Sequence, residues 1–231
     1  MERLTWIDEI KGFAMITVIL GHAVNGYLVS GVQEHRIVLQ AIFDFIYAFH
    51  MPLFFMVSGY LYEITWNERD RSDFLRIKNK LIDLSCLYIL FSIFFWVGKY
   101  FTQSYIQMAN LYTWKDLFLI GIKPLAYLWF LYVLMVLFVI IPVLEHLRLN
   151  KIYILLLALI GYIEWYNAGI IGEIFYGAVY FVLGSWIRQQ NRKGHLIENK
   201  GKGLILALFI CTVNIFYYIL AGHTVDNVDI F

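Results

Sequence analysis

The sequence predicts an all-α fold, a polytopic transmembrane helical bundle of about seven spans with its N-terminus in the cytoplasm. Of its 231 residues, 61% are hydrophobic and 15% are charged, and the mean hydropathy is +0.68. Long apolar stretches recur along the whole chain, and stretches of this kind are typical of membrane helices. The net charge is only +1, and no basic, weakly hydrophobic region is present to bind nucleic acid.

Seven apolar stretches are predicted to form the spans. They lie at about 12–30, 37–62, 81–98, 125–144, 152–168, 171–187 and 203–221. Residues 99–124 are aromatic and mixed in polarity, and they end at Pro124. Because Tyr and Trp favour the headgroup level, we expect this stretch to be interfacial or re-entrant.

The distribution of Lys and Arg predicts the orientation. With the N-terminus inside, fourteen of the eighteen Lys and Arg residues fall on the inner side. The four on the outer side are Arg36, Lys99, Lys115 and Lys123. Cytoplasmic loops of membrane proteins carry such an excess of positive charge. An odd number of spans then places the C-terminus outside.

The first span carries an ionisable side chain at depth. Lys11 and His22 are eleven residues apart, so they share one face of a helix together with Asp8, Met15 and Val18. The rise of a helix separates them by roughly 16 Å, about half the thickness of the hydrocarbon core. An ionisable group at this depth indicates a functional site. The alternative is a His that only hydrogen-bonds a neighbouring helix.

The second span carries His50 directly before Met51 and Pro52. Proline removes a backbone donor, so we expect a kink near residues 48–52 and a carbonyl that needs another partner. A His beside such a break is placed to line a cavity, which Asp44 could also face. A packing kink is the alternative. Ser58 and Gly59 are expected to let another helix approach closely.

Five segments together resemble the membrane acyltransferase family 3, and most closely its fucose 4-O-acetyltransferase-like branch. In chain order they are DEIKGFAMITVILGH, FIYAFHMPLFFMVSGYLY, FLRIKNKL, LWFLYVLMVLF and YFVLGSWIRQ. The most specific feature is a basic residue separated from a His by ten intervening residues, followed by the FHMPLFF segment. The resemblance extends with motifs from residue 4 to about 190, and more loosely to the end of the chain.

This resemblance implies an integral membrane enzyme of the cytoplasmic (inner) membrane. Members transfer an acetyl or other acyl group, generally from cytoplasmic acyl-CoA, to sugars of cell-surface polysaccharides or lipid-linked glycans. We therefore expect residues 1–231 to form a single acyltransferase domain with acetyl-CoA as donor, a carbohydrate acceptor and no metal. Since relatives usually have about ten spans, we also expect this domain to be incomplete at its C-terminus.

The resemblance places the family's first-helix motif on Lys11 and His22 and its second-helix His on His50. Acyl transfer to a hydroxyl needs a base, and His is the side chain that titrates near neutral pH. Direct transfer and an acyl-His relay both remain open. Cys86 and Cys211 fall in apolar spans and indicate neither a disulfide nor a nucleophile.

The family's basic pair after the second helix falls among Arg76, Lys78 and Lys80. This cationic cluster lies on the predicted cytoplasmic side and suits the phosphates of coenzyme A. Here the sequence continues as LIDLSCLY, without the usual proline, so the register of the pair is open. Such a cluster is also what the charge rule gives any membrane protein.

Two other functions are compatible with these residues. Buried histidines and a kinked helix would also line the pathway of a glycan-lipid transporter or flippase. A non-catalytic membrane subunit is the other alternative.

Overall fold

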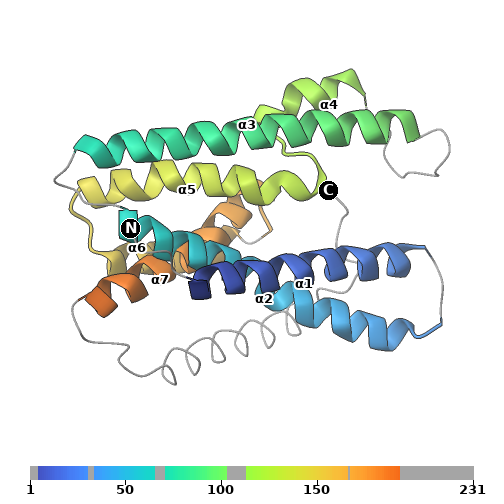
Figure 1. Ribbon diagram of the computed structural model, residues 1–231, viewed down its shortest axis with the longest axis horizontal. Coiled ribbons are helices and arrows are strands. Elements are labelled where there is room, and N and C mark those ends of the chain that lie inside the picture. The colour runs from blue at the N-terminus through green and yellow to red at the C-terminus, as the bar shows by residue number, and fades with distance from the viewer. Residues whose placement is uncertain (1–4, 31–33, 66–70, 103–112, 166, 193–231) are drawn as a thin grey trace. The chain divides into compact units, whose positions relative to one another are not determined.

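The computed structural model is entirely helical in the residues that it describes (Figure 1). These residues are 5–30, 34–65, 71–102, 113–165 and 167–192. The α-helices are α1 (Thr5–Val29), α2 (Arg36–Thr65), α3 (Arg71–Thr102), α4 (Trp114–Phe118), α5 (Trp129–His146), α6 (Lys151–Trp165) and α7 (Ile170–Arg192). Two short 3₁₀ segments, η1 (Leu119–Gly121) and η2 (Ala126–Leu128), connect α4 to α5.

The all-α prediction is confirmed for this part of the chain, and six helices coincide with six of the predicted spans. Four stretches are long and apolar enough to cross a bilayer: Arg36–Thr65, Ile77–Thr102, Trp129–His146 and Ile170–Gln190. Helices α1 and α6 are not among these four, and the predicted span 203–221 lies outside the described residues. The count of about seven spans and the inward N-terminus therefore stay predictions.

The chain divides into two compact units, which are described separately. The first unit combines residues 1–64 with 180–229, and the second combines residues 65–179 with 230–231. Helices α1, α2 and the second half of α7 thus belong to the first unit. Helices α3 to α6 and the first half of α7 belong to the second.

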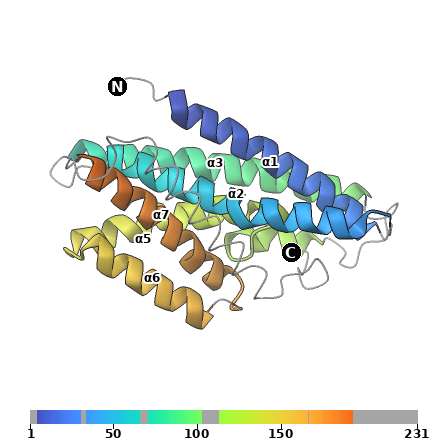
Figure 2. The same cartoon turned by 90° about the horizontal axis from the view of Figure 1, so that it is seen from below.

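In the first unit, the buried face of α1 follows a helical period through Ile7, Ala14, Gly21 and Leu28. It meets α2, whose Phe43 and Phe55 are fully buried. The turn between the two helices is closed by Arg36, which donates from Nη1 to the Leu28 carbonyl at 3.2 Å. Helices α1 and α2 are thereby held as an antiparallel hairpin (Figure 2).

Helix α2 also packs against the second half of α7, with the two backbones in direct contact. A Cβ on Gly59 would overlap the Phe181 carbonyl, and one on Gly184 would overlap the Met56 carbonyl. Small residues allow this approach between membrane helices, as the sequence predicted for Gly59. Beside the glycines, Ser185 Oγ donates to the Glu63 carboxylate at 3.1 Å, and both residues are buried.

In the second unit, α3 and α5 lie side by side (Figure 1) and bury Leu84, Tyr88, Val133 and Leu137. The turn from α5 to α6 is held by a buried ion pair, with Lys151 Nζ 2.6 Å from Glu145 Oε1. An ion pair of this kind satisfies both charges where the two helix ends meet.

The predicted interfacial stretch 99–124 contains the end of α3 and then the short helix α4. Its residues 113–121 dock on α3 through two hydrogen bonds. Trp96 Nε1 donates to the Thr113 carbonyl at 2.8 Å, and the Tyr88 hydroxyl donates to the Ile120 carbonyl at 2.5 Å. The stretch contains no second long helix among the residues described.

Candidate active site

The two predicted histidines both contact one tyrosine, Tyr47, in the first unit. The Tyr47 hydroxyl is 3.4 Å from His22 Nδ1, and the two rings meet edge-on with centroids 6.4 Å apart. The Tyr47 ring also meets the His50 ring edge-on, with centroids 4.8 Å apart. The fold therefore brings His22 of α1 and His50 of α2 into one cluster around Tyr47.

A glycine makes this contact between α1 and α2 possible. A Cβ on Gly21 would lie 3.1 Å from Ile46 Cγ2 and 3.1 Å from the Tyr47 ring. These distances are tighter than ordinary packing contacts. Since Gly21 directly precedes His22, the missing side chain brings the His22 backbone close to Tyr47.

The hydrogen bond of His50 determines its tautomer. His50 Nδ1 lies 2.7 Å from the Ile46 carbonyl oxygen, which can only accept. Nδ1 must therefore carry the proton, and in the neutral ring Nε2 is left as an acceptor. The side chain is only 2% exposed, so its orientation is fixed by packing as well.

Helix α2 continues through Pro52 from Arg36 to Thr65, so the proline does not end the helix. Proline lacks the N–H that would otherwise bond the carbonyl four residues earlier, that of Ala48. The bond from His50 goes to the carbonyl of Ile46, not to the carbonyl that the proline releases. His50 therefore lies close to the proline in the sequence, but it does not bond the carbonyl that the proline leaves without its usual partner.

The other predicted residues of the first unit are less buried than His50. Lys11 is half-buried on α1, three turns before His22, while Asp8 and Met15 on the same face are exposed. Asp44 is half-buried, and its Oδ1 accepts a hydrogen bond from Gln40 Nε2 at 2.8 Å. Asp44 therefore has a local partner one turn away on α2.

The predicted donor-binding cluster lies on α3, in the second unit. Lys78 and Lys80 are exposed, and the Arg76 side chain lies outside the described residues. The exposure of the two lysines leaves their ammonium groups accessible to an anionic ligand.

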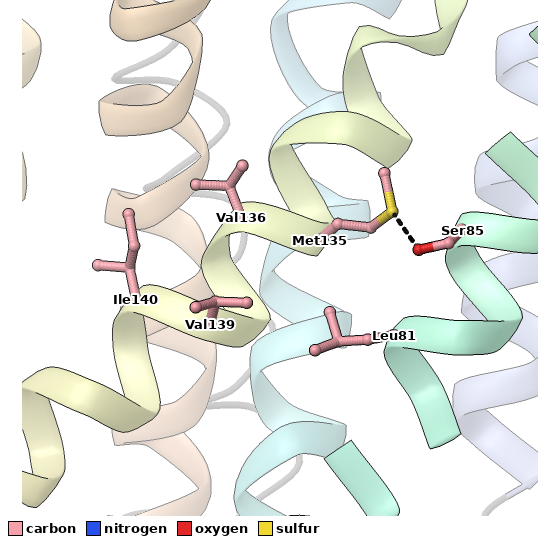
Figure 3. A pocket seen from close by; sticks show the side chains of 6 residues that line it. All are labelled: Leu81, Ser85, Met135, Val136, Val139 and Ile140. Atoms are coloured by element: carbon pink, nitrogen blue, oxygen red, sulfur yellow. Dashed lines mark hydrogen bonds between the residues drawn. The ribbon is translucent and has the colours of Figure 1, made fainter. Parts of the chain in front are cut away.

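The second unit also has a shallow groove of about 420 Å³ between α3 and α5 (Figure 3). Leu81 and Ser85 line it from α3, and Met135, Val136, Val139 and Ile140 line it from α5. Ser85 Oγ donates to the sulfur of Met135 at 3.3 Å. Since no lining residue is ionisable, the groove offers packing surface but no acid or base.

Two residues of the candidate site, Tyr47 and Gly21, were not singled out from the sequence. Tyr47 precedes His50 by three residues, so helical spacing already places it on a neighbouring part of the same face. Gly21 is a small residue directly before an ionisable one in an apolar helix, which is a sign of close helix contact. Neither signal identifies the partner helix.

A family model described as an acyltransferase domain matches residues 4–230 of the chain. The match extends over both units. Among curated proteins and among solved structures, none matches the chain.

Proposed function

The chain belongs to acyltransferase family 3, and from this premise we propose that it is a membrane-bound O-acyltransferase acting on a sugar hydroxyl. The observation that supports a catalytic site is the cluster of His22 and His50 around Tyr47. The donor in this proposal is cytoplasmic acyl-CoA, with acetyl as the group transferred. The acceptor is a cell-surface polysaccharide or lipid-linked glycan, as in the fucose 4-O-acetyltransferase-like branch, and the location is the cytoplasmic membrane.

In the proposed reaction, His22 takes the proton of the sugar hydroxyl. The sugar oxygen then attacks the thioester carbonyl, the C–S bond breaks, and coenzyme A leaves as a thiol after receiving the proton. A base in this role contributes about 10²- to 10⁴-fold to the rate. In the alternative relay, His22 itself attacks the thioester carbonyl, the C–S bond breaks and coenzyme A leaves as a thiolate. The sugar oxygen then attacks the acyl carbon, the C–N bond to the ring breaks, and the hydroxyl proton passes to the thiolate.

Exposure and hydrogen bonding favour His22 over His50 for this role. His22 is half-buried, so one edge of its ring can meet a substrate, whereas His50 is 2% exposed. If His22 Nδ1–H donates to the Tyr47 oxygen, Nε2 is left with the lone pair that a base or nucleophile needs. His50 then contacts the Tyr47 ring edge-on and helps to fix its position.

Lys11 and the basic cluster complete the proposal. Lys11 anchors α1 at the cytoplasmic surface and so sets the depth of His22. Arg76, Lys78 and Lys80 bind phosphates of the donor, because such anions suit clustered cations. Their contribution falls with salt, since exposed charges are screened.

We predict that His22→Gln abolishes acyl transfer, lowering turnover at least about 100-fold. Gln keeps part of the hydrogen bonding but cannot act as a base near neutral pH. The measurement is transfer of radiolabelled acetyl from acetyl-CoA to an extracted acceptor glycan in membranes. Because Gln is neutral and similar in size, insertion into the membrane should be unchanged.

His50→Gln is the matched comparison, since its amide N–H can still donate to the Ile46 carbonyl. It should retain more activity than His22→Gln. Near wild-type turnover in His22→Gln would show that His22 is a structural residue. Glycan-lipid translocation without transfer or hydrolysis of the acyl group would instead identify a transporter.

A further inference from the structure

Three side chains of the first unit form a cationic and aromatic cluster away from the two histidines in sequence. The Arg188 guanidinium carbon of α7 lies 5.6 Å from the centroid of the Tyr60 ring of α2. Trp6, at the start of α1, meets the same ring edge-on with centroids 5.2 Å apart. A guanidinium within about 6 Å of a ring centroid is attracted by the electron-rich face of the ring.

The close contact between α2 and α7 fixes this cluster. Gly59 directly precedes Tyr60, and Gly184 lies one turn before Arg188. The space that a Cβ would need at either glycine is filled by backbone of the opposite helix. Ser185, which directly follows Gly184, donates to the buried carboxylate of Glu63, which lies one turn after Gly59. Because the two helices cannot rotate or slide without breaking these contacts, the guanidinium is held over the ring.

The exposed parts of the cluster suit a ligand that combines phosphate with a flat aromatic ring. Trp6 is 41% exposed, so its indole can stack on a base, and Arg188 is half-buried with its planar fork of donors. Within the described part of the chain, the ion pairs join other residues, so no carboxylate there neutralises Arg188. The cluster also lies on the predicted cytoplasmic side, where coenzyme A is found.

The separation from the histidines fits the length of coenzyme A. His50 and Tyr60 are ten residues apart on α2, which corresponds to about 15 Å along the helix. The pantetheine arm has a dozen or so chain atoms, so it spans about as far as four extended residues, roughly 14 Å. A nucleotide held at Tyr60 would therefore present its thioester at the depth of His50 and Tyr47.

We propose that Arg188, Tyr60 and Trp6 bind the nucleotide end of the acyl-CoA donor, with the guanidinium on a phosphate and the Trp6 indole stacked on the adenine. This inference rests on the proposed function, because it deepens the assignment of the donor. This nucleotide site lies on the unit that carries the histidines. It is separate from the predicted phosphate site on α3. A phospholipid headgroup shares the phosphate but lacks the base.

The test measures binding by calorimetry of the full chain in nanodiscs of a zwitterionic lipid. The three ligands are coenzyme A, adenosine 3′,5′-bisphosphate as its nucleotide end, and pantetheine. Arg188→Gln should raise the Kd of the first two about tenfold, the loss of one charged contact, and leave pantetheine unchanged. Trp6→Ala should raise the same two values at least about fivefold, the loss of one stacked base.

Three comparisons make the result specific. Lys115→Gln removes one positive charge from the predicted opposite side and should leave every Kd unchanged. Arg188→Lys keeps the charge without the planar fork and should restore binding in part, which also excludes misfolding as the cause. Removing Arg76 and Lys80 together tests the predicted phosphate site on α3 separately from this cluster.

Wild-type affinity of Arg188→Gln for coenzyme A would overturn the inference and leave the proposed function intact. If Arg188→Gln changes the Kd for coenzyme A only in nanodiscs containing anionic lipid, the cluster binds lipid headgroups. That result would also overturn the inference. If the wild type binds no coenzyme A or acyl-CoA, the proposed function fails, and the inference fails with it. His22→Gln should bind coenzyme A normally, which separates donor binding from catalysis.

Discussion

At His22, the chemistry depends on a residue of another helix. The ring reaches Tyr47, whose hydroxyl lies 3.4 Å from Nδ1, and Gly21 lets the two helices approach for this contact. A base works only when its free nitrogen faces the substrate, and a partner on the other nitrogen sets that orientation. Tyr47 is therefore a positioning residue in the proposed mechanism.

We predict that Tyr47→Phe lowers turnover by roughly tenfold, because the hydrogen bond to His22 contributes on the order of 1 kcal/mol to orienting the ring. The Phe ring keeps the edge-on contacts with both histidines, so the fold should persist. The measurement is turnover as a function of pH in the acetyl-transfer assay, in which the apparent pKa of the base should also change. A merely structural tyrosine would leave the pH profile unchanged.

Gly21→Ala tests whether the close contact between α1 and Tyr47 orients His22. The added Cβ would press on the Tyr47 ring, so turnover should fall here too. Gly26→Ala on the same helix is the matched control, since a Cβ there has no atom within 4 Å. Equal effects of the two alanines would show that the contact at Gly21 has no role in orienting His22.

At the scale of elements, α4 illustrates how a five-residue helix persists beside a long one. The Asp116 carboxylate accepts from the Thr113 backbone N–H at 2.7 Å and from the Thr113 hydroxyl at 2.8 Å. A carboxylate at the third position of a helix thereby satisfies a donor that the helix itself leaves unpaired. These two bonds lower the pKa of Asp116 below its usual value. Isolated helices this short are not stable, so the cap and the docking on α3 hold α4 in place.

We predict that the protection of residues 113–118 against amide exchange is lost in acid. Because the pKa of Asp116 is lower in the folded state, its cap stabilises α4 above the unfolded pKa, near 4, and this stabilisation disappears as pH falls through the folded pKa. Exchange between pH 7 and pH 2, corrected for the intrinsic rate, measures this. Asp116→Asn cannot titrate, so the same pH dependence in that variant would contradict the assignment.

At the scale of the whole molecule, large apolar side chains face outward from both units. Examples are Ile19 at 64% exposure, Phe94 at 71% and Ile163 at 72%. In water such surfaces would cause association, whereas in a bilayer they contact lipid tails. Together with the family and the four described helices that are long and apolar enough to cross a bilayer, they indicate a multi-pass membrane protein.

The charge asymmetry predicts on which side each loop lies. In a variant without Cys86 and Cys211, Lys115→Cys should react with an impermeant maleimide in intact cells. Asn150→Cys, between α5 and α6, should react only after the membrane is permeabilised. Both positions are exposed, so access to the reagent depends on the side of the membrane. The reverse labelling pattern would refute the orientation with the N-terminus inside.

The sequence by itself determined the membrane class, the positions of six helices and the candidate residues His22, His50 and Lys11. These follow from hydropathy, charge and helical period, which are properties of contiguous segments. Only the tertiary structure decided which side chains meet. Tyr47 contacts both histidines, Arg188 lies over Tyr60, and Ser185 bonds Glu63 across 122 residues of chain. Such contacts depend on how far each helix is rotated and on which glycine faces which neighbour, and spacing within one helix contains no information about either.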